Sequence, residues 1–185
     1  DGEVTISRAQ IAITFPARFM LIAAMNPCPC GYRGDPKHTC QCSQQLIQRY
    51  WGKISGPLLD RIDIHIEVPA VEWKELTETS DGESSLEIRD RVNTARKVQL
   101  KRFSKTSIFC NAQMKSNLIK RHCSLDSSSL RHLEKAVDKL GLSARAYHRV
   151  LKIARTIADL DGAETIQNHH VSEAIQYRTL DRRFG

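Results

Sequence analysis

Four cysteines form two close pairs, Cys28-x-Cys30 and Cys40-x-Cys42, with nine residues between the pairs. This spacing suits a tetrahedral zinc site, because thiolates bind zinc well and a turn-rich loop can bring the pairs together. His38 lies between the pairs and is a possible substitute ligand. A closed site with four protein ligands would be structural and not catalytic. The alternative is a set of free thiols in a surface loop.

Three other polar residues could contact a ligand. Asn26 directly follows an apolar run that is typical of a buried strand. Ligands of open α/β sheets bind beyond the carboxyl ends of the strands, so Asn26 is placed to contact one. Arg61 lies between Asp60 and Asp63, so a local ion pair is an equally open interpretation. Arg145 falls in the first turn of an expected helix, where the helix dipole disfavours a cation. The alternatives without a functional role are that Asn26 makes a turn hydrogen bond and that Arg145 is simply exposed to solvent.

The sequence before residue 70 predicts a sheet with short helices. The continuous apolar run Phe19–Met25 predicts a strand buried on both faces, and the alternating run Ile62–Val68 predicts an edge strand. Residues 4–15 predict a β-hairpin with Arg8 near its tip. Residues 43–53 predict a helix capped by Ser43, and Pro57 starts a short helix with Leu58 and Leu59 inward.

The rest of the chain predicts a small helical bundle after an acidic linker. The residues that mark its helices are the capping box Ser84 to Glu87, the stripe Ile88, Val92, Ala95, Gln99 and Phe103, the segment Met114–Cys123, and the caps Asp126, Ser143 and Asn168 with Gly141 as a stop. Cys110 and Cys123 read as isolated thiols that are buried or partly buried.

Composition and charge narrow the classes of function. The chain has 185 residues, 41% of them apolar, and no apolar run reaches the roughly 18 residues of a membrane span. The polar, acidic start predicts no signal peptide, so we expect a cytoplasmic protein. The net charge is +7, and residues 88–123 hold ten Lys and Arg against one acidic residue. Such a segment can attract a phosphate backbone, although a solvated helix face is an equal alternative.

The motif LIAAMNP at residues 21–27, followed by GPLLDRIDI at residues 56–64, resembles the second half of an AAA+ ATPase core. The resemblance covers most of the chain and is closest to the magnesium-chelatase-like branch, of the YifB/ComM type. It implies that Asn26 is the sensor-1 residue, Arg61 the arginine finger and Arg145 the sensor-2 residue, with ATP and Mg²⁺ as cofactors. It also implies that the hairpin with Arg8 faces the central pore of a ring.

The expected fold is therefore α/β followed by all-α. Residues 1–70 would be the C-terminal part of an AAA+ parallel-sheet core with a Cys-rich insertion, residues 71–83 a linker, and residues 84–185 a helical lid. The sequence has no G-x-x-x-x-G-K-[ST] phosphate loop and no apolar run ending in Asp-Glu, so this chain alone should not hydrolyse ATP.

The resemblance implies a homo-oligomeric ring, expected to be a hexamer, that remodels DNA, for example by branch migration. Two alternatives stay open. One is an ATPase subunit of a metal chelatase, and the other is a non-catalytic, zinc-bearing nucleic-acid-binding module.

Overall fold

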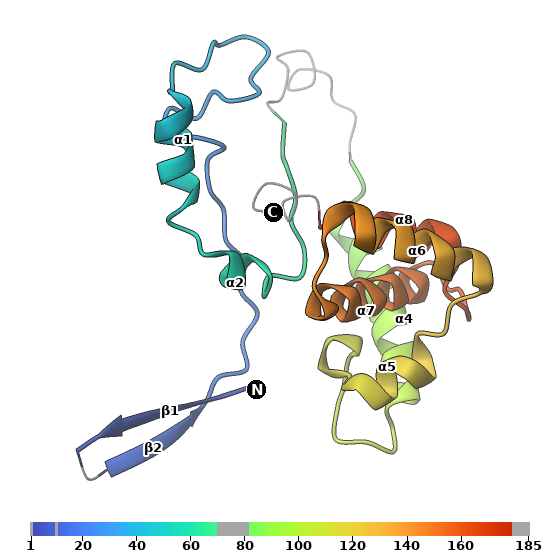
Figure 1. Ribbon diagram of the computed structural model, residues 1–185. Coiled ribbons are helices and arrows are strands. Elements are labelled where there is room, and N and C mark those ends of the chain that lie inside the picture. Colours follow the sequence, from blue (N-terminus) through green and yellow to red (C-terminus); the bar gives the residue numbers. More distant parts are fainter. Residues whose placement is uncertain (1, 10, 70–81, 179–185) are drawn as a thin grey trace. The chain divides into compact units, whose positions relative to one another are not determined.

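The computed structural model describes residues 2–9, 11–69 and 82–178. The chain divides into two compact units, one ending at Tyr50 and one beginning at Trp51. Figure 1 labels the helices and strands of both units. None of the helices in the described ranges is both long enough and apolar enough to cross a membrane. The expected linker, residues 71–83, falls mostly outside these ranges.

The first unit begins with the predicted hairpin, which the structure confirms. Strands β1 (Glu3–Arg8) and β2 (Ile11–Pro16) pair antiparallel, with Val4 opposite Phe15. Directly opposed residues share a face of a hairpin, so its apolar side chains gather on one face. Arg8 is exposed and is the last residue of β1 before the turn, as the sequence predicted.

The two longer strands expected from the sequence do not form. Residues 19–25 and 62–68 are irregular, and Ile22 in the first of them is 84% exposed. An edge strand needs a neighbour on one edge to bond its backbone groups, and a central strand needs one on each edge. Among the described residues, strand pairing is confined to β1 and β2. The described residues therefore contain one two-stranded sheet, and about half of them are in helices. The parallel-sheet core stays a prediction.

Two short helices lie between residues 43 and 60. Helix α1 (Gln44–Trp51) begins at Ser43, whose Oγ accepts a hydrogen bond from the Leu46 N–H at 3.3 Å. Helix α2 (Gly56–Leu59) is capped by Ser55 and has Pro57 in its first turn. Leu59 is buried, but Leu58 is 47% exposed, so the inward prediction for Leu58 was wrong. A helix of a single turn can bury only one side.

The second unit contains the helical bundle. Its elements are α4 (Ser85–Arg102), the 3₁₀ helix η1 (Asn111–Gln113), α5 (Ser116–His122), α6 (Ser127–Leu140), α7 (Ala144–Leu160) and α8 (Asn168–Gln176). Helix α7 is the centre of the bundle, since α4, η1, α5 and α8 all contact it. Its inward residues Val150, Ala154 and Ala158 have no exposed surface.

Most predicted helix ends are confirmed. Ser84 and Glu87 form the capping box, and Asp126 and Ser143 cap α6 and α7. Gly141 ends α6 with φ at 61°, a left-handed value that favours glycine. The predicted cap Asn168 was wrong, because the N-cap of α8 is the preceding residue, Gln167.

The stripe predicted on α4 is only half confirmed. Ala95, Gln99 and Phe103 are buried, whereas Ile88 and Val92 are 41% and 42% exposed. The N-terminal half of α4 therefore carries apolar side chains that the described residues leave uncovered.

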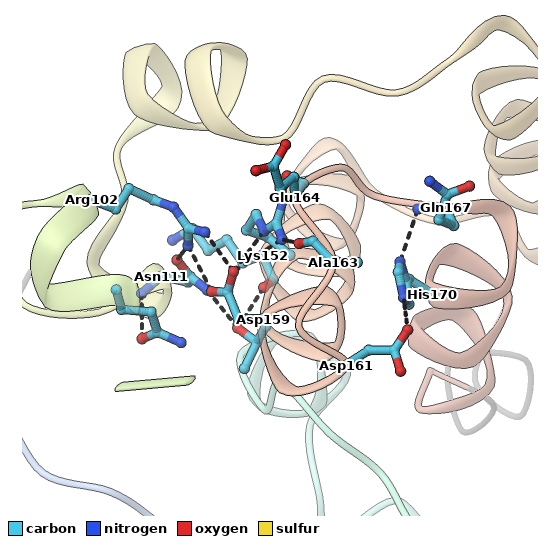
Figure 2. A network of polar contacts seen from close by, with 12 residues as sticks. Arg102, Asn111, Lys152, Asp159, Asp161, Ala163, Glu164, Gln167 and His170 are labelled. Atoms are coloured by element: carbon cyan, nitrogen blue, oxygen red, sulfur yellow. Dashed lines mark hydrogen bonds and ion pairs between the residues drawn. The ribbon is translucent and has the colours of Figure 1, made fainter. Parts of the chain in front are cut away.

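A buried carboxylate holds α4, η1 and α7 together (Figure 2). The two oxygens of Asp159 accept hydrogen bonds from both terminal nitrogens of Arg102, at 2.5 and 2.7 Å. Asn111 Nδ2 and Arg155 Nε donate to the same carboxylate at 2.8 and 3.0 Å. Arg155 also donates to the carbonyls of Ala163 and Glu164, just after α7.

The charge of Asp159 is kept by its donors. Desolvation alone would raise the pKa of Asp159, but hydrogen bonds from Arg102 and Asn111 outweigh it, so the pKa lies below its usual value. Because the pKa is lower in the folded state, this stabilisation is complete above about pH 4 and is lost as the pH falls through the folded pKa.

Asp159→Ala should lower the free energy of unfolding of the bundle by about 3–5 kcal/mol, because it leaves two arginines without their buried counter-charge. Urea denaturation followed by helical circular dichroism measures the change. The control is Asp138→Ala, on the exposed side of α6, with an expected effect within about 0.5 kcal/mol. Equal losses for the two variants would contradict a structural role for Asp159.

Candidate functional site

The four paired cysteines come together in the first unit. The Sγ of Cys28 lies 3.3 Å from that of Cys30 and 3.7 Å from that of Cys40, and Cys30 and Cys40 are 3.6 Å apart. All four sulfur atoms, including Cys42, lie within 4.8 Å of one another. Tetrahedral zinc with bonds of about 2.3 Å would place its sulfur ligands about 3.8 Å apart. The donor set and its spacing therefore fit one zinc ion.

The loop between the pairs is folded by local bonds. The carboxylate of Asp35 accepts hydrogen bonds from the backbone N–H groups of Lys37 and His38, at 2.7 and 2.9 Å. The His38 ring pairs with the same carboxylate at 3.4 Å and lies against Tyr32. These contacts leave the four cysteines as the ligand set, without His38.

The thiols of the cluster differ in acidity. A hydrogen bond from the Tyr32 N–H, with the neighbouring Cys28 thiol, lowers the pKa of Cys30 to about 6. Burial raises the pKa of Cys42 to about 12. The Cys30 thiolate is thus stable near neutral pH. A bound dication would favour deprotonation of the other three thiols, since coordination deprotonates a thiol.

The cysteine cluster should bind one zinc per chain. Elemental analysis should give a zinc-to-chain ratio near one, and changing Cys28 and Cys40 together to Ser should abolish it. Cys110→Ser is the control, because Cys110 lies outside the cluster and should leave the ratio unchanged. A folded, metal-free chain with four reduced thiols after exposure to zinc would contradict this prediction.

Asn26 lies immediately before the cysteine loop. It is exposed, and its side-chain amide lies close to Gly31 in the cysteine loop. Because residues 19–25 are not a strand, the structure does not place Asn26 at a strand end. Its sensor-1 assignment stays a prediction.

Arg61 follows helix α2 and is exposed. Its Nη1 donates to the carbonyl of Pro57 at 2.8 Å, and within the described ranges it makes no ion pair. The local pairing of Arg61 with Asp60 or Asp63 is therefore not what the structure shows. The remaining donors of this guanidinium are open to an external anion.

Asp60 and Asp63 contact the start of α7. Asp60 Oδ1 accepts a hydrogen bond from Ser143 Oγ at 3.1 Å, and its Oδ2 lies 3.5 Å from Arg145 Nη1. Arg149 Nη1 donates to Asp63. A carboxylate at this helix N-terminus offsets the unfavourable position of Arg145 against the dipole. The structure thus brings Arg145 to the residue next to Arg61.

Arg145 is followed on α7 by two further cations, Arg149 and Lys152, and both are engaged. Arg149 is bonded to Asp63, and Lys152 Nζ donates to the Ala112 carbonyl at 2.8 Å. Arg145 is 56% exposed and keeps most of its donors free. Arg145 and Arg61 are therefore the members of this surface best placed to meet a phosphate.

Sequence reasoning missed Arg178, which has no exposed surface. Its Nη1 donates to the Ile62 carbonyl, and its Nη2 lies 3.7 Å from Asp60 Oδ1. No local pattern marks this residue, because its partners lie more than a hundred positions earlier in the chain.

Asp161 lies close enough to two histidines, His169 and His170, for the three to be considered as metal ligands. Both are in the first turn of α8, and both rings lie near Asp161. His170 Nδ1 accepts the Gln167 N–H at 2.9 Å, so the neutral ring carries its proton on Nε2 and donates it to Asp161 (Figure 2). A metal ion on Nε2 would displace that proton onto Nδ1, against the Gln167 N–H. This cluster is therefore a helix cap and not a metal site.

The two remaining thiols match their predictions. Cys123 is buried, with its pKa raised to about 11 by burial, and Cys110 is partly buried. Neither belongs to the metal-compatible cluster.

Two family models match the chain. The model of the magnesium chelatase subunit ChlI matches residues 1–76, and that of its C-terminal region matches residues 82–178. The chain belongs to the magnesium-chelatase family. The two matches are separated by residues 77–81, and the linker over residues 71–83 stays a prediction.

Similar proteins come from several bacteria. Competence protein ComM of Haemophilus influenzae is 48% identical over 184 residues, which is 98% of this chain and 35% of the relative. YifB of Escherichia coli is 43% identical over the same coverage. A Mycobacterium tuberculosis relative is 34% identical over 99% of this chain and 36% of its own length. The chain thus spans about a third of these relatives, and the first two carry the ComM and YifB names expected from the sequence.

Proposed function

We propose that this chain is the C-terminal part of a ring-forming AAA+ ATPase, in which Arg61 is the arginine finger. The observation that carries the proposal is the exposed Arg61 guanidinium, which follows α2 and is bonded only to the Pro57 carbonyl among the described residues. Membership of the magnesium-chelatase family supports an ATPase-related role.

The three candidate residues would act on one reaction in different ways. A guanidinium directed at the transferring phosphoryl group neutralises charge that develops in the transition state. Arg145, as sensor 2, would contact a nucleotide phosphate from the helical bundle. Asn26, as sensor 1, would hydrogen-bond the γ-phosphate or orient the attacking water. The nucleotide and Mg²⁺ would be held mainly by residues outside this chain, which is why the chain alone should not hydrolyse ATP.

An arginine finger requires a neighbouring nucleotide. We propose that Arg61 reaches the nucleotide of the next subunit, since an arginine finger can be supplied in trans. A closed ring of identical subunits supplies every finger with a site. We propose a homo-oligomeric ring, with six subunits as the expected size.

DNA is the proposed substrate of the motor. Arg8 at the tip of the exposed hairpin suits contacts with phosphates, and so do the basic residues of positions 88–123 other than Arg102, which is bonded to Asp159. The name of the ComM relative as a competence protein is compatible with this assignment. Branch migration is the proposed form of remodelling.

A metal-chelatase ATPase subunit is the second candidate, favoured by the description of both matching family models. The two differ in what stimulates hydrolysis. Duplex or branched DNA should raise the ATPase rate of a DNA motor, whereas a chelatase subunit should respond to its partner subunits and a tetrapyrrole.

Arg61→Ala in the full-length protein should reduce ATP hydrolysis by roughly 10³-fold, with ATP binding largely spared, because the finger acts mainly in the transition state. Steady-state hydrolysis and nucleotide titration measure the two effects. Arg131→Ala, an exposed arginine on α6, is the matched control and should hydrolyse ATP at the normal rate.

Mixing tests whether the finger acts across subunits. Rings that combine Arg61→Ala subunits with subunits mutated in the phosphate loop should recover part of the activity, because an intact finger then meets an intact site. Mixed rings that form but never recover activity would overturn the arginine-finger assignment.

A further inference from the structure

We propose that Arg178 is the positioning residue through which the helical bundle fixes the arginine-finger candidate. This proposal rests on the proposed function of Arg61. It concerns the residues that hold the finger, and not the finger's own chemistry.

Arg178 bonds to both neighbours of Arg61. It follows α8 and has no exposed surface. Its Nη1 donates to the backbone carbonyl of Ile62, while its Nη2 lies 3.7 Å from the Asp60 carboxylate. One buried guanidinium therefore contacts both residues that flank Arg61, through the Ile62 backbone carbonyl and the Asp60 side-chain carboxylate.

Asp60 extends this clamp to α7. Its carboxylate accepts the Ser143 hydroxyl at 3.1 Å, and Ser143 in turn caps α7 by accepting the Ala146 N–H at 3.1 Å. The residue before Arg61 is thus attached to the first turn of the central helix. Its position depends on α7 as well as on Arg178.

A backbone bond adds a third attachment. The His65 N–H donates to the Tyr177 carbonyl at 2.8 Å, one residue before Arg178. The segment from Asp60 to His65 is therefore bonded to residues 177 and 178 at three points. The start of this segment is also held locally, because the N–H groups of Arg61 and Ile62 donate to the carbonyls of Leu58 and Leu59.

The geometry explains why an arginine is needed. A planar guanidinium can offer separate N–H groups to the carbonyl and the carboxylate, whereas a lysine offers one point charge. Arg178→Lys keeps the positive charge but cannot span both partners. The Arg61 side chain would then start from a less defined backbone position, and misplacement of about 1 Å can cost roughly 10²-fold in rate.

The test is Arg178→Lys in the full-length protein. The kcat for ATP hydrolysis should fall roughly 10- to 100-fold, while the KM for ATP stays within about twofold. Binding of ADP with fluoroaluminate, a mimic of the transferring phosphoryl group, should weaken, and binding of ADP alone should not.

A buried arginine in the same bundle is the matched control. Arg155→Lys removes bonds to Asp159 and to two carbonyls, so it should lower the melting temperature. It should leave kcat per assembled ring unchanged, because Arg155 does not contact the segment that carries Arg61.

The double variant separates positioning from general damage. If Arg178 acts only through Arg61, adding Arg178→Lys to Arg61→Ala should cause no further loss of kcat. Multiplying losses would overturn the proposal. An unchanged kcat for Arg178→Lys, beside a large loss for Arg61→Ala, would overturn it and leave the proposed function intact. An unchanged rate for Arg61→Ala would instead reject the proposed function.

A milder variant decides the matter if Arg178→Lys fails to assemble. Asp60→Asn keeps an acceptor for Ser143 but loses the charge that faces Arg178. Asp60→Asn should lower kcat in intact rings that contain Arg61. In rings that already carry Arg61→Ala, adding Asp60→Asn should not lower kcat further. An unaltered kcat for Asp60→Asn would contradict the clamp.

Discussion

The bundle depends on one buried carboxylate that neutralises two arginines, the buried Arg155 and the partly buried Arg102. Asp159 receives donors from α4, from η1 and from α7 itself, so its removal would break three attachments at once. Buried ion pairs add little net stability compared with apolar packing, but losing one partner is costly. The main effect of this network is therefore to determine which helices pack together. Its net contribution to stability is small.

Helix α7 connects this constraint to the candidate site. Asp159 lies near its C-terminal end, while Ser143 and Arg145 lie at its start, about 24 Å away at 1.5 Å per residue. The polar network fixes one end of a continuous helix, and the other end contacts Asp60. One helix therefore carries both the core network and the residues that contact Asp60.

Local signals were predictable from sequence, and distant pairings were not. The hairpin, the caps at Ser84, Asp126 and Ser143, and the cysteine cluster all depend on residues close in sequence. The expected strands at residues 19–25 and 62–68 failed because apolar patterning describes a strand but does not supply its neighbours. Arg178 could not be foreseen, since a buried arginine is explained only by partners that folding brings to it.

Competition for two carboxylates explains why Arg61 is left exposed. Asp60 and Asp63 flank it in sequence, yet their contacts go to Ser143, Arg145, Arg149 and Arg178 in the bundle. Had either carboxylate paired with Arg61, the guanidinium would be neutralised and less able to stabilise developing negative charge. The same contacts that attach the segment to the bundle thus keep the charge of Arg61 available for an anion from another molecule.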